Sequence, residues 1–148
     1  RADIIRWTME QNGRRVEFRY HGDGPAQALP QYRIAALPEG YTETERAASY
    51  AAGDVKYTNA DGDMILLSYL YMSDGVVSGF ELDNGDTMTD TQVNGIPATL
   101  IVSSMEGNFS SVTWRDTASN IEFTVAAVAD EPVIIAMAES VSLCNSTN

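Results

Sequence analysis

The sequence holds little of the chemistry on which most catalytic and metal sites depend. Its 148 residues include one cysteine, Cys144, and one histidine, His21. A single cysteine excludes an internal disulfide, and one cysteine with one histidine cannot supply the four ligands of a structural zinc site. A serine triad would have to be built on His21, which lies in a glycine-rich loop. We therefore expect no catalytic residues, no metal site and no cofactor.

Positive charge is also scarce. Nine Lys and Arg stand against 21 Asp and Glu, which gives a net charge of −12 and an isoelectric point near 4.2. This balance argues against binding of DNA, RNA or an anionic membrane across the whole surface, because phosphates would meet like charge. The charge is uneven, since residues 1–33 carry six basic and four acidic side chains. That end could face a membrane or an acidic partner, or could be an ordinary solvated strand face.

Long hydrophobic runs are missing. The longest apolar stretches, Met64 to Leu67 and Val125 to Ala129, are far shorter than the roughly 18 residues that span a bilayer. The chain begins at Arg1 and not at a methionine, so we expect an upstream anchor or signal segment to have been removed. Its length predicts a single domain over residues 1–148, with a polar tail at 144–148.

What the sequence does contain is a series of turn signals that separate stretches with strand character. Asn12-Gly13 is the clearest, because apolar and polar residues alternate on both sides of it. This pattern predicts a β-hairpin that places Trp7 and Phe18 on one buried face and the arginines on the other.

Further strands are predicted along the chain. The segment 64–72 is almost entirely apolar, so we expect it at the centre of a sheet with both faces covered. Residues 42–52 permit a helix, but strand is favoured there. Asp74-Gly75 and Asn84-Gly85 mark additional turns. The other predicted strands are 31–36, 54–58, 96–105, 109–114 and 121–125.

One helix is predicted, near the C-terminus. Asp130 is a suitable N-cap, and Ile134, Ile135, Ala138 and Val141 recur at helical spacing, so the helix should end near residue 143. Such a helix must bury its apolar stripe on the sheet. The expected fold is therefore α+β: a mainly antiparallel, curved sheet of roughly eight strands with one C-terminal helix packed on it.

Three groups of residues could carry function. The turns 59–63 and 83–86 hold several side-chain oxygens of the kind that bind calcium, but Asp, Asn and Gly are also what such turns require. Carboxylates about 5–9 Å apart could hydrolyse glycosides, although 21 acids make chance pairs common. Aromatic side chains could line a pocket for a lipid-like or peptide ligand, with Trp7, Phe18, Tyr69 and Trp114 as candidate wall residues.

The order of several short motifs resembles a known bacterial family. A Leu37-Pro38-Glu39-Gly40-Tyr41 turn is followed by Val93-Asn94-Gly95 before an apolar strand, then by a strand ending in Trp114, an alternating strand at 121–125 and Ala138-Glu139-Ser140-Val141 in the helix. Over residues 4–143 this order is similar to that of domain of unknown function 4367. The resemblance implies an extracytoplasmic domain of gut-dwelling Gram-positive bacteria, usually behind one transmembrane helix, with no catalytic residues to carry over. A more distant likeness to periplasmic lipoprotein carriers and sigma-regulator sensors implies a curved sheet that holds an apolar ligand against helices.

Three functions remain open. The leading hypothesis is a non-catalytic extracytoplasmic binding or sensing module, tethered to the membrane by a removed upstream anchor. The first alternative is a carrier or sensor of a hydrophobic ligand, and the second is a glycan-acting hydrolase with paired carboxylates. The expected partner is a protein or a small hydrophobic ligand, not a nucleic acid, and a monomer is expected in preference to an oligomer.

Overall fold

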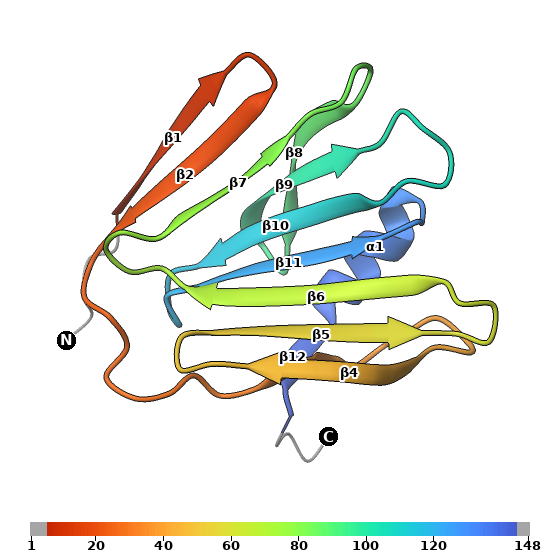
Figure 1. The fold of residues 1–148 in the computed structure, drawn as a ribbon, viewed down its shortest axis with the longest axis horizontal. Coiled ribbons are helices and arrows are strands. Elements are labelled where there is room, and N and C mark those ends of the chain that lie inside the picture. The colour runs from red at the N-terminus through yellow and green to blue at the C-terminus, as the bar shows by residue number, and fades with distance from the viewer. Residues whose placement is uncertain (1–5, 145–148) are drawn as a thin grey trace.

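The computed structural model of the chain describes residues 6–144 and, for Arg6 and Trp7, the backbone alone. Within that range the chain forms twelve strands and one helix (Figure 1). All strand pairs are antiparallel, so the predicted α+β class is confirmed. The elements are β1 (Arg6–Asn12), β2 (Arg15–His21), β3 (Tyr32–Ile34), β4 (Thr42–Ala48), β5 (Ala52–Thr58), β6 (Met64–Tyr71), β7 (Val77–Glu81), β8 (Thr87–Val93), β9 (Ile96–Val102), β10 (Ser110–Asp116), β11 (Ile121–Ala127), α1 (Glu131–Glu139) and β12 (Val141–Leu143).

The strands form three sheets. Seven of them make the main sheet, in the order β4-β5-β6-β11-β10-β9-β8. A second sheet has the order β1-β2-β7, and a small third sheet pairs β12 with β3. In Figure 1 the hairpin β1–β2 and β7 stand at one side of the main sheet, while α1 lies behind it.

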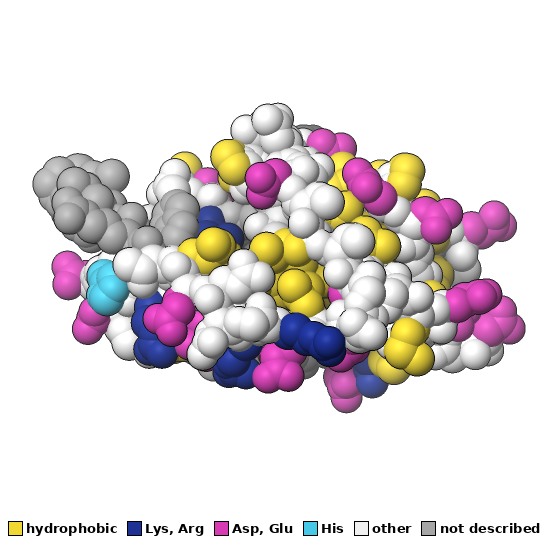
Figure 2. All heavy atoms as spheres, turned by 90° about the horizontal axis from the view of Figure 1, so that it is seen from above, with side chains coloured by type: hydrophobic (Ala, Val, Ile, Leu, Met, Phe, Trp, Pro, Cys, Tyr) yellow, Lys and Arg dark blue, Asp and Glu magenta, His cyan; other side chains and the backbone are white. Residues whose placement is uncertain are grey.

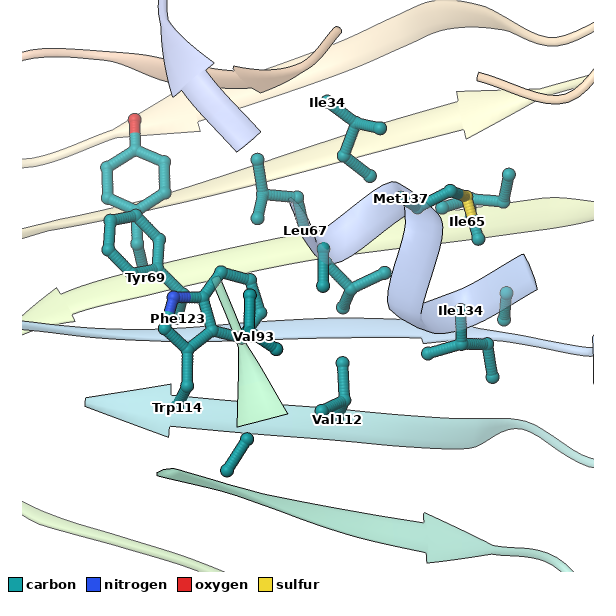
Figure 3. Close-up of a cluster of buried hydrophobic side chains, with 14 of the residues drawn as sticks. Ile34, Ile65, Leu67, Tyr69, Val93, Val112, Trp114, Phe123, Ile134 and Met137 are labelled. Atoms are coloured by element: carbon teal, nitrogen blue, oxygen red, sulfur yellow. The ribbon is translucent and has the colours of Figure 1, made fainter. Parts of the chain in front are cut away.

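The main core lies between the main sheet and α1. Side chains alternate along each strand, so Ile65, Leu67 and Tyr69 of β6 are buried on the helix side. Ile134 and Met137 of α1 meet them there, and Figure 3 shows these side chains in one continuous cluster. Full burial of one such aliphatic side chain contributes about 1.5–3 kcal/mol, which holds the helix on the sheet.

A second, smaller core lies on the opposite face of the main sheet, which we call the outer face. It consists of the buried residues Val16, Phe18, Tyr20 and Met72, with half-buried apolar side chains around them. The predicted hairpin is confirmed. Three of the four buried residues of this core belong to β2, so the predicted buried face is confirmed for β2, whereas the side chain of Trp7 in β1 lies outside the described residues. The three-stranded sheet therefore covers part of the outer face.

The prediction for the segment 64–72 is wrong in part. β6 lies between β5 and β11, and only its helix-side residues are fully buried. Leu66, Ser68 and Leu70 face the other way and are half-buried, because the three-stranded sheet does not extend over all of β6. An apolar run does not reveal how far a distant sheet will reach over it.

The helix also ends earlier than predicted. It begins after Asp130, which is the N-cap, but it stops at Glu139 and not near Leu143. The Ser140 hydroxyl donates to the carbonyl of Met137 at 2.8 Å and accepts from the backbone N–H of Ala36 at 3.0 Å. Residues Val141–Leu143 then pair with β3 as strand β12. Pairing with β3, which is far away in the sequence, replaces the last turn of the predicted helix.

The strand predicted over 42–52 is confirmed by β4, which covers most of it. Two strands lie where only turns were recognised, β7 and β8. β7 contains Ser78 and Gly79, and β8 is mostly polar, so neither has a strong strand pattern. In the described part of the chain, no helix is long and apolar enough to cross a membrane.

Candidate functional site: a cleft between two sheets

A cleft of about 460 Å³ opens between the three-stranded sheet and the outer face of the main sheet. We call it the intersheet cleft. Figure 2, which views the molecule from above, shows hydrophobic side chains near the middle of the visible face and most of the visible Lys and Arg side chains along its lower border. The lining residues are Phe18, Asp90, Gly95, Ile96, Pro97, Ala98, Thr99, Arg115, Asp116, Thr117 and Ala118.

Two tight turns bring these residues together. The turn between β8 and β9 is Asn94-Gly95, and both residues adopt positive φ angles, 50° and 81°, as a hairpin turn of this kind requires. The turn after β10 is shaped by Asp116, whose Oδ1 accepts from the N–H of Ala118 at 3.0 Å. One rim of the cleft is therefore made of turns that β-strands hold in place on both sides.

The floor of the cleft is joined to a buried ionic network. Glu122 of β11 is 4% exposed and pairs with Arg115 of β10, the side chain of which is 9% exposed, at 3.4 Å. The Tyr20 hydroxyl donates to Oε2 of Glu122, and the Ser78 hydroxyl donates to Oε1 at 2.6 Å. Nε of Arg115 donates to the Tyr20 oxygen at 2.6 Å. The network thus connects β2 and β7 of one sheet to β10 and β11 of the other.

The hydrogen bonds of this network hold its side chains in place. Burial, together with the negative charge of Glu122, raises the pKa of the Tyr20 hydroxyl far above its ordinary value of 10.0. Tyr20 therefore stays protonated and acts as a hydrogen-bond donor at neutral pH. Every buried side-chain nitrogen and oxygen in the described part of the chain has a hydrogen-bond partner, so the network holds its members in one arrangement.

The charge in the cleft is dominated by acids. Arg115 is balanced by Glu122 beneath it, whereas the carboxylates of Asp90 and Asp116 line the cleft itself. No ion pair joins either of them to a cation among residues 8–144, the part of the chain with described side chains. With Phe18, Ile96 and Pro97 as apolar walls, the cleft offers apolar contact and negative charge together. That combination suits a ligand with both apolar and cationic groups.

The four wall residues proposed from the sequence do not share one site. Phe18 lines the intersheet cleft. Tyr69 and Trp114 lie on the helix side of the main sheet, where both contact Phe123 at centroid distances of 6.3 and 5.2 Å. They are 3% and 4% exposed in the packed core that Figure 3 shows. Trp7 lies in β1, but its side chain is outside the described residues.

Sequence reasoning missed Arg115, Asp90 and Asp116. A signal for Arg115 existed, because it follows the apolar Trp114 in a strand and must face the opposite side of the sheet. Glu122 precedes Phe123 in the same way, and the two charged residues are direct partners across β10 and β11. What the sequence could not show was that a second sheet covers this pair. Asp90 and Asp116 gave no signal beyond their charge.

In the acidic turns 59–63 and 83–86, side-chain oxygens accept hydrogen bonds from backbone N–H groups. Oδ1 of Asn59 accepts from the N–H groups of Asp61 and Asp63 at 3.0 and 2.9 Å. Asp86 accepts from the N–H groups of Asp83 and Ser104, and these bonds lower the pKa of its carboxyl. These oxygens shape the turns. Residues 6–144 contain no cluster of three or more His, Cys, Asp or Glu that could hold a metal ion.

A second hollow region lies at the opposite end of the main sheet. Two clefts of about 390 and 340 Å³ meet at Gly107 and Val128, among the loops that precede β6 and β10 and follow β11. Exposed apolar side chains gather here, including Met64, Met105 and Phe109. No buried charged pair forms the floor of these clefts, since every charged residue that lines them is exposed. The intersheet cleft is therefore the better-organised site.

Comparison with known proteins gives one match. A family model described as Domain of unknown function (DUF4367) matches residues 31–141, which is most of the chain. The match includes Asp90, Arg115 and Glu122 but not the hairpin β1–β2, so Phe18 and Tyr20 lie outside it. No curated protein and no solved structure matches. The family resemblance inferred from the sequence motifs is thus confirmed.

Proposed function

Since the chain belongs to the DUF4367 family, we propose that it is a non-catalytic binding or sensing module that acts outside the cytoplasm as part of a membrane-anchored protein. The intersheet cleft is its ligand site. The observation that carries this proposal is the cleft itself, about 460 Å³ in volume and fixed by the buried Arg115–Glu122 pair. A preorganised cleft with both apolar and charged walls is typical of binding sites.

The groups available in the cleft favour binding over catalysis. The pKa of Tyr20 is raised, so this residue is neither a nucleophile nor a base at neutral pH. Neither His21 nor Cys144 lines the cleft. His21 contacts Asp74 at 3.5 Å, and the backbone N–H of Cys144 donates to the carbonyl of Gln31. The two most reactive side chains of the sequence therefore lie away from the proposed ligand.

A fragment screen tests the site without assuming the chemistry of the ligand. The ¹⁵N-labelled domain is mixed with basic, acidic, aromatic and aliphatic fragments, and backbone amide shifts are recorded. We expect at least one class to move the amides of residues 95–99 and 115–118. Ala118→Phe fills the cleft and should abolish these shifts, whereas Ala136→Phe, on the exposed face of α1, should leave them. Shifts that survive Ala118→Phe would place the site elsewhere.

The extracytoplasmic location is tested separately through Cys144, which is partly exposed. Intact cells that carry the full-length protein are treated with a membrane-impermeant maleimide. We expect labelling in intact cells that is lost in Cys144→Ser. Labelling that depends on Cys144 but occurs only after lysis would contradict this part of the proposal.

One observation keeps a hydrolase as a second candidate. Asp90 and Asp116 both line the intersheet cleft, and a pair of carboxylates is the usual machinery of glycoside hydrolysis. Release of reducing sugar from a panel of bacterial and host glycans, lost in both Asp90→Asn and Asp116→Asn, would favour this candidate. Because α1 and the main sheet are packed together, a hydrophobic ligand would not lie between them. In the carrier alternative, the ligand therefore binds in the intersheet cleft. Aliphatic fragments in the screen test it.

A further inference from the structure

Strand β8 is an open edge of the main sheet. It is the last strand in the sheet order, and within residues 6–144 no strand pairs with its other side. β8 pairs with β9 in continuous register over its whole length, from Thr87 opposite Val102 to Val93 opposite Ile96. In a strand bonded on one side only, alternate N–H and C=O groups point outward and can bind another extended chain.

Two other outer strands, β4 and β1, carry features by which proteins block such pairing. β4, at the far edge of the main sheet, contains Glu43, Glu45 and Arg46, and its register is interrupted between the two glutamates. β1 carries Arg6 and Glu10. β8 has no proline, no register shift and one charged residue, Asp90. Charges, prolines and bulges protect edges, so β8 is less protected than β4 or β1. β7, the outer strand of the three-stranded sheet, also has an unbroken register and one charged residue, Glu81. β8 differs from β7 because its charged residue, Asp90, lines the intersheet cleft.

Asp90 connects this open edge to the intersheet cleft. It lies opposite Thr99 on the outer face of the sheet, and it lines the cleft together with Asp116. We propose that β8 binds an extended basic peptide segment of a partner protein as an additional strand, with a Lys or Arg side chain that reaches Asp90 and the cleft. This inference rests on the proposed function, since it assigns the ligand class of the same site.

The alternation of side chains along β8 defines the peptide. Met88, Asp90 and Gln92 face the outer side, while Thr87, Thr89 and Thr91 face the helix side. Directly opposed residues of paired strands approach within about 4.5–5.5 Å, so a basic residue opposite Asp90 forms an ion pair. The residues two positions away on either side meet Met88 and Gln92, next to Pro97. The favoured pattern is therefore apolar, any, basic, any, apolar.

A second copy of the chain fits this edge poorly. Asp90 is the central residue of β8, so two antiparallel copies paired about their centres would place one Asp90 against the other. Like charges in direct opposition destabilise a strand pair. Each copy also carries a net charge of −12. A basic peptide meets neither obstacle.

The test is an NMR titration of the ¹⁵N-labelled domain with a capped peptide, Thr-Val-Thr-Lys-Thr-Val-Thr. We expect shifts at the β8 amides and slower hydrogen exchange at those that face away from β9. Replacement of the peptide lysine by glutamate should weaken binding about ten-fold, since an attraction becomes a repulsion. Two further peptides carry N-methyl groups on alternate amides. One of the two should not bind, because only one set of N–H groups can face β8.

The protein variants make the test specific to Asp90. Asp90→Asn should weaken binding about three-fold, as expected for a partly exposed ion pair. Asp23→Asn removes the same charge from an exposed loop and should leave binding unchanged. No binding of the parent peptide, equal binding of both methylated peptides, or equal losses in the two variants would overturn the inference. Shifts at β8 that depend on protein concentration alone would also overturn it, in favour of self-association.

The fragment screen separates this inference from the proposed function. If fragments occupy the cleft in an Ala118-dependent manner while the peptide does not bind, the cleft is a ligand site and the peptide assignment is wrong. If neither binds, both are wrong.

Discussion

The guanidinium carbon of Arg115 lies 3.6 Å from the centroid of the Phe18 ring. A residue of β10 in the main sheet thus stacks on a residue of β2 in the three-stranded sheet. A cation over an aromatic face is attracted by about 0.5–2 kcal/mol, with the higher values in desolvated sites. The contact shapes one wall of the intersheet cleft, and it links the N-terminal hairpin to the part of the chain that matches the family.

Phe18→Leu should test the value of this contact. Leucine keeps an apolar side chain but loses the ring face, so we expect the free energy of unfolding to fall by about 1–2 kcal/mol. Urea denaturation measures the change. Phe109→Leu is the control, because Phe109 is 37% exposed at the other end of the sheet. Equal losses in the two variants would show that the stacking adds nothing.

Glu122→Gln should be far more damaging. The glutamine leaves the charge of Arg115 buried without its partner, and breaking a buried ion pair in this way costs about 3–5 kcal/mol. Glu81→Gln breaks a pair with Arg15 in which both side chains are more than half exposed, so it should have a much smaller effect. Urea denaturation of both variants measures the two losses in the free energy of unfolding. A loss for Glu122→Gln as small as that for Glu81→Gln would contradict the buried network.

The double variant Arg115→Met, Glu122→Leu should be more stable than Glu122→Gln. It removes both charges at once, and apolar replacement of a buried pair is often neutral or stabilising. A double variant that is less stable would mean that Ser78 and Tyr20 depend on the pair for their own hydrogen bonds.

Gly53→Ala tests the packing of the main core. Gly53 lies directly opposite Tyr69 on the neighbouring strand, and a Cβ atom at Gly53 would overlap the Tyr69 ring. We expect a loss of about 1–3 kcal/mol, the usual cost of overpacking. Gly24→Ala, where a Cβ meets nothing within 4 Å, should not destabilise the protein. Gly53→Ala combined with Tyr69→Ala should cost less than the sum of the two single changes, because the overlap disappears.

Glu43→Gln should flatten the dependence of stability on acid pH. Hydrogen bonds from Arg46 at 2.7 and 2.9 Å lower the pKa of the Glu43 carboxyl below its ordinary value of 4.5. A lowered pKa in the folded state stabilises the protein above pH 4.5, and this stabilisation is lost as the pH falls through the lowered value. The free energy of unfolding, measured by urea at a series of pH values, should fall less steeply in the variant. Identical slopes would contradict the pairing.

Local patterns were enough to predict most of the fold. Alternation around Asn12-Gly13 predicts the β1–β2 hairpin, and the cap at Asp130 predicts the start of α1. These features depend on neighbours within a few residues. The pairing of β2 with β7 and the replacement of the last helical turn by β12 depend on segments about 60 and 110 residues away, so no local pattern contains them.

The candidate site was less predictable. Of the three proposed wall residues with described side chains, Phe18 lies in the intersheet cleft and Tyr69 and Trp114 do not. Tyr69 and Trp114 have the same aromatic character but face the helix. Alternation predicts which residues share a face of the sheet, but it does not predict which face carries a cleft. The role of Arg115 depends on the three-stranded sheet that covers it, and the sequence does not predict that sheet.

The long sequence separation between Tyr20 and Glu122, 102 residues, has a kinetic consequence. The hairpins β4–β5, β5–β6, β8–β9, β9–β10 and β10–β11 join consecutive strands, so they can form early at little entropic cost. The three-stranded sheet must instead bring β2 to β7 and then to β10 and β11, and non-local pairing of this kind is slow. We therefore expect the intersheet cleft to be assembled late in folding, after these hairpins have formed.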